Sequence, residues 1–378
     1  MPSSPGSLTS LRLVFALNAL GLSVWFPRIP DVKQALDLDV LELAFALFGM
    51  PAGTMLGFLI VERITDRLGV RKTCVWGGSI FFLSFIGPAL ATGPVTLGLA
   101  LFVCGLTIAS IEVAMNAKAS QTETELGRRI MTGCHAWWSF GTVTGALVAG
   151  AFAQAGIGFL TQQIILQPIF AVLNVWFALR MIDDVALDRS TPKEKFRMPE
   201  GALLVLCMVP IGALLIEGAM LEWSALFLRE NLELDPFTTS ATFSAFALSM
   251  GIVRLLGDPL AERFGPHGVI LGSAALMGVG ILMFGGSGSI YMAAPAAAMV
   301  GLGCGNIYPL TMSIVGRLPG TKPARNVATL ALIAFTAFLI GPPLIGVAAK
   351  LFGLPMALMI LSPFGVVPFL LLRRQGRH

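Results

Sequence analysis

The chain has 378 residues, of which 56% are hydrophobic and 12% are charged, and its net charge is +4. In soluble domains about a quarter of all residues are charged. This composition therefore excludes an ordinary soluble protein and indicates a chain that lies in lipid along its whole length. Five cysteines without CxxC or metal-ligand spacing and three scattered histidines point away from a disulfide framework or a metal site. We expect no cofactor, no metal ion and no nucleic-acid partner.

Twelve apolar stretches follow one another along the chain, each near the roughly 20 residues that a helix needs to cross a bilayer. They cover residues 9–33, 41–62, 73–92, 95–118, 130–156, 160–181, 201–228, 237–257, 268–286, 290–315, 326–349 and 353–372. Backbone groups in lipid must be bonded internally, and the alternating pattern of a barrel is missing, so the expected fold class is an all-α membrane protein. The N-terminus lacks a basic start and a small-residue cleavage site, so the first stretch is expected to be a retained span.

The distribution of positive charge predicts the orientation of these spans. With the N-terminus inside, the outer side holds only Arg28, Lys33, Arg229 and Lys350, which leaves 21 of the 25 Lys and Arg residues on the inner side. Because positive residues concentrate in cytoplasmic loops, both termini are expected to be cytoplasmic.

A long polar stretch separates the first six spans from the last six. The predicted organisation is an N-terminal six-helix half at 1–182, a cytoplasmic linker at 183–199 and a C-terminal six-helix half at 200–378. An offset of 196 residues places the loop DRLG (66–69) on ERFG (262–265). Two related helical halves around a midplane site are the architecture of a secondary transporter.

The loops carry a family resemblance. ERITDRLGVRK (62–72), with its echo DPLAERFGPHG (258–268), resembles the signature loop of the major facilitator superfamily. Within that family, WFPRIPDVKQAL (25–36), HAWWSFG (135–141) and EWSALFLREN (222–231) resemble a bacterial subgroup with rhizopine-permease-like and sugar-permease-like members. The resemblance covers the whole chain and implies twelve spans in two pseudo-symmetric halves, in a monomer that lies in the bacterial cytoplasmic (inner) membrane among its lipids.

The resemblance also implies a cytoplasmic gate, in which the acid and the arginine of the signature loop hold the inner ends of the two halves together. These roles fall on Asp66 and Arg67, with Gly69 for the tight turn and Arg71 facing anionic lipid or a helix end. The predicted gate comprises Glu62, Asp66, Arg67, Gly69, Arg71, Arg254, Asp258, Glu262 and Arg263. Arg254 and Asp258 are four residues apart and can pair on one helix face, whereas solvated helix ends would explain the extra acids equally well.

Ionisable residues inside apolar spans are costly, so each one is a candidate functional group. Glu112 lies in the fourth span, His135 lies at a similar depth in the fifth, and Glu217 lies near the middle of the seventh. We predict that these three are the proton-coupling groups; the alternative is that they make structural hydrogen bonds between helices. Glu222 lies closer to the outer interface, where solvation or a pairing with Arg28 would explain it.

Aromatic and amide side chains in the spans complete a predicted substrate site. Aromatic faces beside hydrogen-bonding groups suit sugars and polyols, although Trp at the end of a span is also a common interface anchor. The predicted substrate-binding set is Asn18, Trp25, Arg28, Glu112, Asn116, His135, Trp138, Glu217, Trp223 and Asn306.

These features predict a secondary active transporter that moves a small polar solute (a sugar, an inositol or an amino-polyol) by alternating access, coupled to protons. The sequence contains no P-loop, which argues against a nucleotide-driven pump, and no nucleophile–base pair indicates an enzyme. Drug/proton antiporters of the superfamily carry an Arg in the fourth span and a GxxxGPxxGG-like motif in the fifth, and this chain departs from both. Efflux of amphipathic compounds and uncoupled facilitation are the alternatives.

Overall fold

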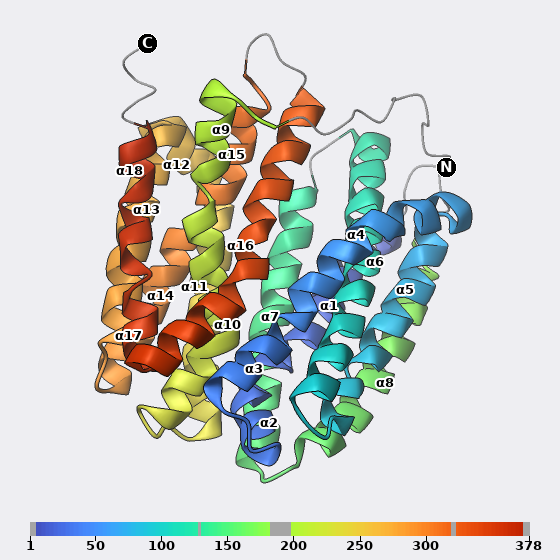
Figure 1. Ribbon diagram of the computed structural model, residues 1–378. Coiled ribbons are helices and arrows are strands. Elements are labelled where there is room, and N and C mark those ends of the chain that lie inside the picture. Colours follow the sequence, from blue (N-terminus) through green and yellow to red (C-terminus); the bar gives the residue numbers. More distant parts are fainter. Residues whose placement is uncertain (1–4, 128–129, 182–197, 319–322, 373–378) are drawn as a thin grey trace. The chain divides into compact units, whose positions relative to one another are not determined.

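The computed structural model describes residues 5–127, 130–181, 198–318 and 323–372, and in these segments every regular element is helical (Figure 1). Twelve stretches of helix are long and apolar enough to cross a membrane, from Ser7–Ala35 to Leu354–Leu372. The expected fold class, an all-α membrane protein with twelve spans, is therefore confirmed.

Contacts along the chain separate two compact units. Unit 1 comprises residues 1–189 and 235–244, and unit 2 comprises residues 190–234 and 245–378. Most of the predicted linker at 183–199 lies outside the described residues, so the predicted domain boundaries stay a prediction.

Unit 1 contains the first six spans, and its helices follow from the apolar runs of the sequence. Its elements are α1 (Pro5–Ser23), η1 (Phe26–Arg28), α2 (Ile29–Ala35), α3 (Val40–Leu47), α4 (Gly49–Leu68), α5 (Val70–Ser84), η2 (Gly87–Leu90), α6 (Pro94–Leu126), α7 (Met131–Gln154) and α8 (Phe159–Ala178), together with the start of α11 (Pro236–Leu255). Helix α6 continues eight residues beyond the predicted end of the fourth span at residue 118, because a helix that leaves the lipid needs no apolar residues to persist.

Glycines set the spacing between helices of unit 1. A Cβ at Gly141 or Gly145 of α7 would meet the backbone of α1 at Ala16 and Leu20. Without a hydrophobic driving force between helices in lipid, small residues that allow close backbone approach are what hold neighbours together. Helices α1 and α7 therefore pack in direct backbone contact along two turns.

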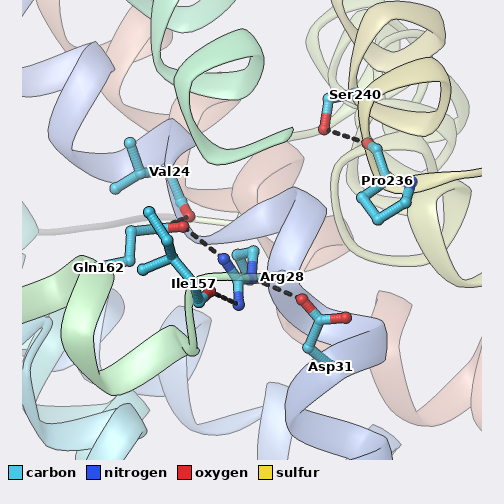
Figure 2. Close-up of polar contacts among 7 residues, drawn as sticks. All are labelled: Val24, Arg28, Asp31, Ile157, Gln162, Pro236 and Ser240. Atoms are coloured by element: carbon cyan, nitrogen blue, oxygen red, sulfur yellow. Dashed lines mark hydrogen bonds and ion pairs between the residues drawn. The ribbon is translucent and has the colours of Figure 1, made fainter. Parts of the chain in front are cut away.

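The start of α11 packs on the same unit. Phe243 of α11 stacks on Phe26 of η1 with ring centroids 6.0 Å apart, and Ser244 Oγ donates to the backbone oxygen of Val143 in α7 at 3.5 Å. A Cβ at Gly150 would meet Ser240, whose hydroxyl donates to the Pro236 oxygen at 2.9 Å (Figure 2). The first turns of the eighth span are thus part of unit 1.

Unit 2 contains the remaining spans, several of which are interrupted. Its elements are α9 (Gly201–Met208), α10 (Ile211–Glu230), the rest of α11, α12 (Gly257–Phe264), α13 (Pro266–Gly285), α14 (Ile290–Cys304), α15 (Ile307–Val315), α16 (Pro323–Phe352), α17 (Leu354–Met359), η3 (Ser362–Gly365) and α18 (Val367–Leu372). The seventh span breaks at residues 209–210, where Pro210 supplies no N–H for the helical ladder. The tenth span breaks at residues 305–306 between α14 and α15. Such breaks free backbone polar groups at membrane depth, where they are tolerated only if protein groups or a cavity satisfy them.

Candidate functional site

The carboxylate of the seventh span is part of an ion pair in unit 2. Glu217 of α10 lies 3.6 Å from Arg254 of α11, measured from Oε1 to Nη2, and their side chains are 16% and 35% exposed. A charged group at membrane depth is usually paired in this way. In the sequence, no base lies near Glu217, and Arg254 and Asp258 can pair on one helix face. In the structure the ion pair of Arg254 is made with Glu217, while Asp258 is exposed. Arg254 is the penultimate residue of α11, so its position in the sequence did not indicate that it reaches a carboxylate of the seventh span.

The same arginine reaches the interruption of the tenth span. Arg254 Nε donates to the backbone oxygen of Gly305 at 3.3 Å, and Asn306 Nδ2 donates to the backbone oxygen of Val253 at 2.9 Å. A Cβ at Gly257 would lie 2.8 Å from Asn306 Oδ1, so this approach requires a glycine. Asn306, which was predicted to bind substrate, is buried and ties α11 to the break between α14 and α15.

Aromatic side chains accompany this cluster. Tyr308 of α15 meets Phe335 of α16 edge-on with ring centroids 5.9 Å apart, and Phe335 lies 5.8 Å from Phe338. Trp223 of α10 is fully buried, and its indole N–H has no hydrogen-bond partner among the residues that the structure describes.

The carboxylate of the fourth span differs from that of the seventh. Glu112 of α6 is half-buried, and within the described segments no hydrogen bond or ion pair reaches its carboxylate. Asn116, one turn further, donates its Nδ2 to the backbone oxygen of Glu112 at 2.9 Å. His135 of α7 is exposed and presents its ring edge-on to Phe15, with ring centroids 5.5 Å apart. Trp138, a turn further along α7, is half-buried.

Arg28, at the outer end of the first span, is surrounded by protein partners (Figure 2). Its guanidinium donates to Gln162 Oε1 at 2.7 Å and to the backbone oxygen of Ile157 at 3.0 Å, and its Nε lies 2.6 Å from Asp31 Oδ2. Gln162 in turn donates to the backbone oxygen of Val24 at 3.0 Å. Arg28 is only 3% exposed, so these contacts account for its burial without a substrate.

Two further predicted residues of the first span are buried in unit 1. Trp25 packs against Phe159 with ring centroids 5.7 Å apart, and its indole N–H has no partner in the described part of the chain. Asn18 donates to the backbone oxygen of Val14 at 2.9 Å, whereas its Oδ1 accepts no hydrogen bond from the described residues.

Buried amides of α8 were missed by the sequence analysis. Gln162, Gln163, Gln167 and Asn174 are all fully buried. Gln167 Nε2 donates to the backbone oxygen of Gly21 at 3.1 Å, and Asn174 Nδ2 donates to that of Cys74 at 3.1 Å. In a membrane, amide side chains that face a neighbouring helix form hydrogen bonds between the helices. Their recurrence within one apolar span was the signal that indicated a buried polar face.

Most residues of the predicted gate lie at exposed helix ends. Asp66, Arg67, Glu262 and Arg263 are exposed, and the side chain of Glu62 lies outside the described part of the structure. The turns after α4 and α12 place Gly69 at φ 85° and Gly265 at φ 71°, which side chains with a Cβ rarely adopt. The guanidinium of Arg71 donates to the backbone oxygen of Leu179 just after α8, so the helix-end alternative is the contact that forms.

Twelve membrane-spanning helices with charged and amide groups at membrane depth define a multi-pass membrane protein of the transporter class. Residues 11–228 and 218–377 match the family model of the Major Facilitator Superfamily, and the chain belongs to this family. Members of this family are transporters rather than enzymes and bind small-molecule substrates, so transport is established as the function at this level.

Relatives and solved structures agree with this assignment. The chain is 29% identical over 367 residues to an uncharacterised MFS-type transporter of Yersinia pestis, covering 96% of this chain and 92% of the relative. It is 24% identical over 376 residues to the membrane protein MosC of Rhizobium meliloti, covering 97% and 89%. A D-xylose-proton symporter has a TM-score of 0.76 at 12% identity, covering 97% of both chains, and the nucleoside transporter NupG has a TM-score of 0.74 at 13% identity, covering 97% and 98%. At these identities the solved structures show the fold alone.

Proposed function

We propose that the chain is a proton-coupled secondary transporter of a small polar solute, a sugar, an inositol or an amino-polyol. It works as a monomer in the bacterial inner membrane, with both termini cytoplasmic and lipid around its outer surface. Alternating access carries the solute across the membrane, and the gate of Asp66, Arg67, Glu262 and Arg263 holds the cytoplasmic ends together in one state.

The observation that carries this proposal is the carboxylate of Glu112. A half-buried carboxylate in the middle of an apolar span costs free energy, and this one has no bonded partner among the described residues that would explain its presence structurally. A group of this kind can take up and release a proton during each cycle. Glu112 is therefore the proposed proton carrier, and Glu217 and His135 are secondary candidates.

The proposed binding residues are chosen because they carry buried polar atoms without a hydrogen-bond partner among the described residues. The indole N–H groups of Trp25 and Trp223 and the Oδ1 of Asn18 are buried without a partner among the described residues. An unmade bond of this kind costs about 1–3 kcal/mol, which a substrate hydroxyl would recover. Asn116 and Trp138 complete the proposed set, whereas Arg28 and Asn306 are already held by protein groups.

A thermal-shift screen of sugars, inositols, amino-polyols and aromatic acids on the purified protein tests the substrate class, because a solute that binds the native state raises the unfolding temperature. We expect stabilisation by myo-inositol or a monosaccharide. Stabilisation by lipophilic cations alone would favour efflux of amphipathic compounds and contradict the proposal.

Transport in proteoliposomes tests the role of Glu112. With one proton per solute, a gradient of one pH unit drives about tenfold accumulation. The variant Glu112→Gln is expected to lose this accumulation and to retain exchange of labelled for unlabelled solute, because exchange needs no net proton movement. Glu125→Gln, an exposed acid of the same helix, is the matched control and is expected to accumulate solute normally. Unchanged pH-driven accumulation in Glu112→Gln would show that Glu112 is not the coupling group.

A further inference from the structure

We propose that Glu217 and Arg254 together form a subsite for a hydroxyl-rich solute without net charge, with Arg254 a binding residue rather than a member of the gate. This inference rests on the proposed function and deepens it, because it selects neutral sugars and inositols over amino-polyols and acids.

The first support is the long distance between the two charged groups of the pair. Charge-assisted hydrogen bonds between nitrogen and oxygen are about 2.7–2.9 Å long, whereas Arg254 Nη2 lies 3.6 Å from Glu217 Oε1. The side chain of Arg254 is 35% exposed. A guanidinium has five N–H donors, and the described contacts of Arg254 engage it with only one carboxylate oxygen and one backbone oxygen. Donors of Arg254 and the second carboxylate oxygen of Glu217 are therefore available to a ligand.

The second support is the position of the pair beside an interrupted span. Arg254 is anchored to the backbone oxygen of Gly305, where α14 gives way to α15. Asn306, on the other side of this break, donates to Val253, the neighbour of Arg254. In transporters of this general architecture, interrupted helices supply backbone groups to binding sites near the midplane. The hydrogen bond from Nε to Gly305 fixes one edge of the guanidinium, and its Nη groups can exchange partners.

The third support is an aromatic surface that packs on α10, the helix of Glu217, and extends to α15. A Cβ at Gly218, the neighbour of Glu217, would lie 3.2 Å from the ring of Phe338, which continues through Phe335 to Tyr308. The rings of Tyr308, Phe335 and Phe338 are half-buried. A pyranose or inositol ring has an apolar C–H face, which packs on aromatic rings, and a polar rim of hydroxyls.

The chemistry of the pair selects the ligand class. Arg254 donates hydrogen bonds and Glu217 accepts them, so two neighbouring hydroxyls match the pair, one as acceptor and one as donor. The charges of Glu217 and Arg254 cancel. A solute with an ammonium or a carboxylate would bring an uncompensated charge to membrane depth, where it is costly. A neutral polyol avoids this penalty.

Three probes test the inference, each scored by thermal shift on the full chain: neutral D-glucose, D-glucosamine with an ammonium at C2, and D-glucuronate with a carboxylate at C6. The wild type is expected to respond most strongly to D-glucose. Glu217→Gln leaves the charge of Arg254 uncompensated and is expected to prefer D-glucuronate, whereas Arg254→Gln leaves the charge of Glu217 and is expected to prefer D-glucosamine. Each single variant is expected to weaken D-glucose binding by about tenfold to a hundredfold, the range for hydrogen bonds to charged groups.

A double variant separates binding from structural support. Replacing both members of an ion pair by apolar residues of similar size leaves no uncompensated charge and is often neutral for stability. The double variant Glu217→Met with Arg254→Met is therefore expected to fold and to lose the D-glucose response. Glu200→Gln and Arg317→Gln, which remove exposed charges from the same unit, are the controls and are expected to keep the wild-type preference.

The outcomes distinguish the inference from the proposed function. An unchanged preference for D-glucose in both single variants, or a full D-glucose response in the double variant, would overturn the subsite and leave the proposed function intact. A wild-type preference for either charged probe would also overturn it. A wild type that responds neither to these probes nor to myo-inositol contradicts the subsite and the proposed function together. If the double variant does not fold, the preferences of the single variants decide.

Discussion

Arg28 in unit 1 and Arg254 in unit 2 contact the same kinds of group but at different distances. Each one meets a carboxylate and a backbone oxygen. Around Arg28 the distances are 2.6 Å to Asp31 and 3.0 Å to Ile157, with a third bond of 2.7 Å to Gln162. Around Arg254 they are 3.6 Å to Glu217 and 3.3 Å to Gly305. The side chains are 4% and 35% exposed, respectively.

The difference teaches how to separate a structural arginine from an exchangeable one in a membrane helix bundle. Arg28 has short bonds on three sides, so a ligand would gain nothing from it without breaking them. Arg254 has two long bonds and open surface, so a ligand can replace one partner at small cost. Both side chains carry the same charge, and their contacts separate the two roles.

The largest effect expected from this comparison is on stability, from Arg28→Met. The substitution removes the contacts of Arg28 with Asp31, Gln162 and Ile157, and hydrogen bonds to charged groups contribute about 1.5–3 kcal/mol each. We expect a large drop in the unfolding temperature of the detergent-purified protein. Arg317→Met removes an exposed arginine and is expected to stay within about 0.5 kcal/mol of the wild type. A loss of less than about 1 kcal/mol for Arg28→Met would place Arg28 with the exchangeable arginines.

A smaller effect is expected from Gly257→Ala, which disturbs the support of Arg254 without touching it. The new Cβ would lie 2.8 Å from Asn306 Oδ1, and overpacking of this kind costs about 1–3 kcal/mol. Gly272→Ala is the matched control, since no atom beyond its own helix backbone and chain neighbours lies within 4 Å of the added Cβ. Unfolding temperatures of the two variants, measured side by side, give the cost. Equal temperatures would mean that the Asn306 contact yields without strain.

Arg254→Met is expected to cost less stability than either change. The Arg254–Glu217 contact is long and its arginine is about a third exposed, and such pairs contribute about 0.2–1 kcal/mol. Solute binding is expected to fall while the unfolding temperature changes little. A stability loss as large as that of Arg28→Met would remove the distinction between the two arginines.

An effect of similar size is expected at Asp235, an exposed carboxylate at the start of α11. The hydrogen bonds of Thr238, from its side chain and its backbone, together with the backbone N–H of Phe237, lower the pKa of Asp235. A lowered pKa stabilises the fold above the unfolded value of about 3.9, and this contribution is lost as the pH falls through the lower folded value.

Asp235 Oδ1 accepts from the first N–H groups of α11 and so caps this helix. The variant Asp235→Ala removes the cap and is expected to cost about 1 kcal/mol at neutral pH. The difference from the wild type is expected to shrink as the pH falls from about 4 through the lower folded pKa of Asp235, because the wild-type carboxylate then becomes protonated. Unfolding temperatures over a pH series, with Glu125→Gln as the control, measure it. A difference that is constant with pH would show that the charge of Asp235 does not contribute.

The spans and the turns could be predicted from the sequence because they depend on local chemistry. Apolar runs must be helical in lipid, and the positive φ of Gly69 and Gly265 follows from loop motifs that ask for a residue without a Cβ. The family followed from the same loops. The interruption at residues 305–306 was not foreseen, although Pro309 lacks the N–H that would bond to the backbone oxygen of Gly305 four residues earlier.

The candidate site could be predicted only in part. Depth along a span is visible in the sequence, so Glu112 and Glu217 could be singled out. Which base pairs with a carboxylate depends on tertiary structure, because the two side chains come from helices that are distant in sequence. For this reason only Asp258, a neighbour on the same helix face, could be named as a possible partner of Arg254, whereas the structure pairs Arg254 with Glu217.

The backbone contact between α1 and α7 at Gly141 and Gly145 has a practical consequence for observing the transport cycle. Two helices whose backbones touch along two turns cannot slide or rotate past each other without steric clash. A pair of spin labels or fluorophores on α1 and α7 is therefore expected to report the same separation in every state of the cycle. Such a pair gives an internal ruler, against which changes in any other labelled distance can be calibrated.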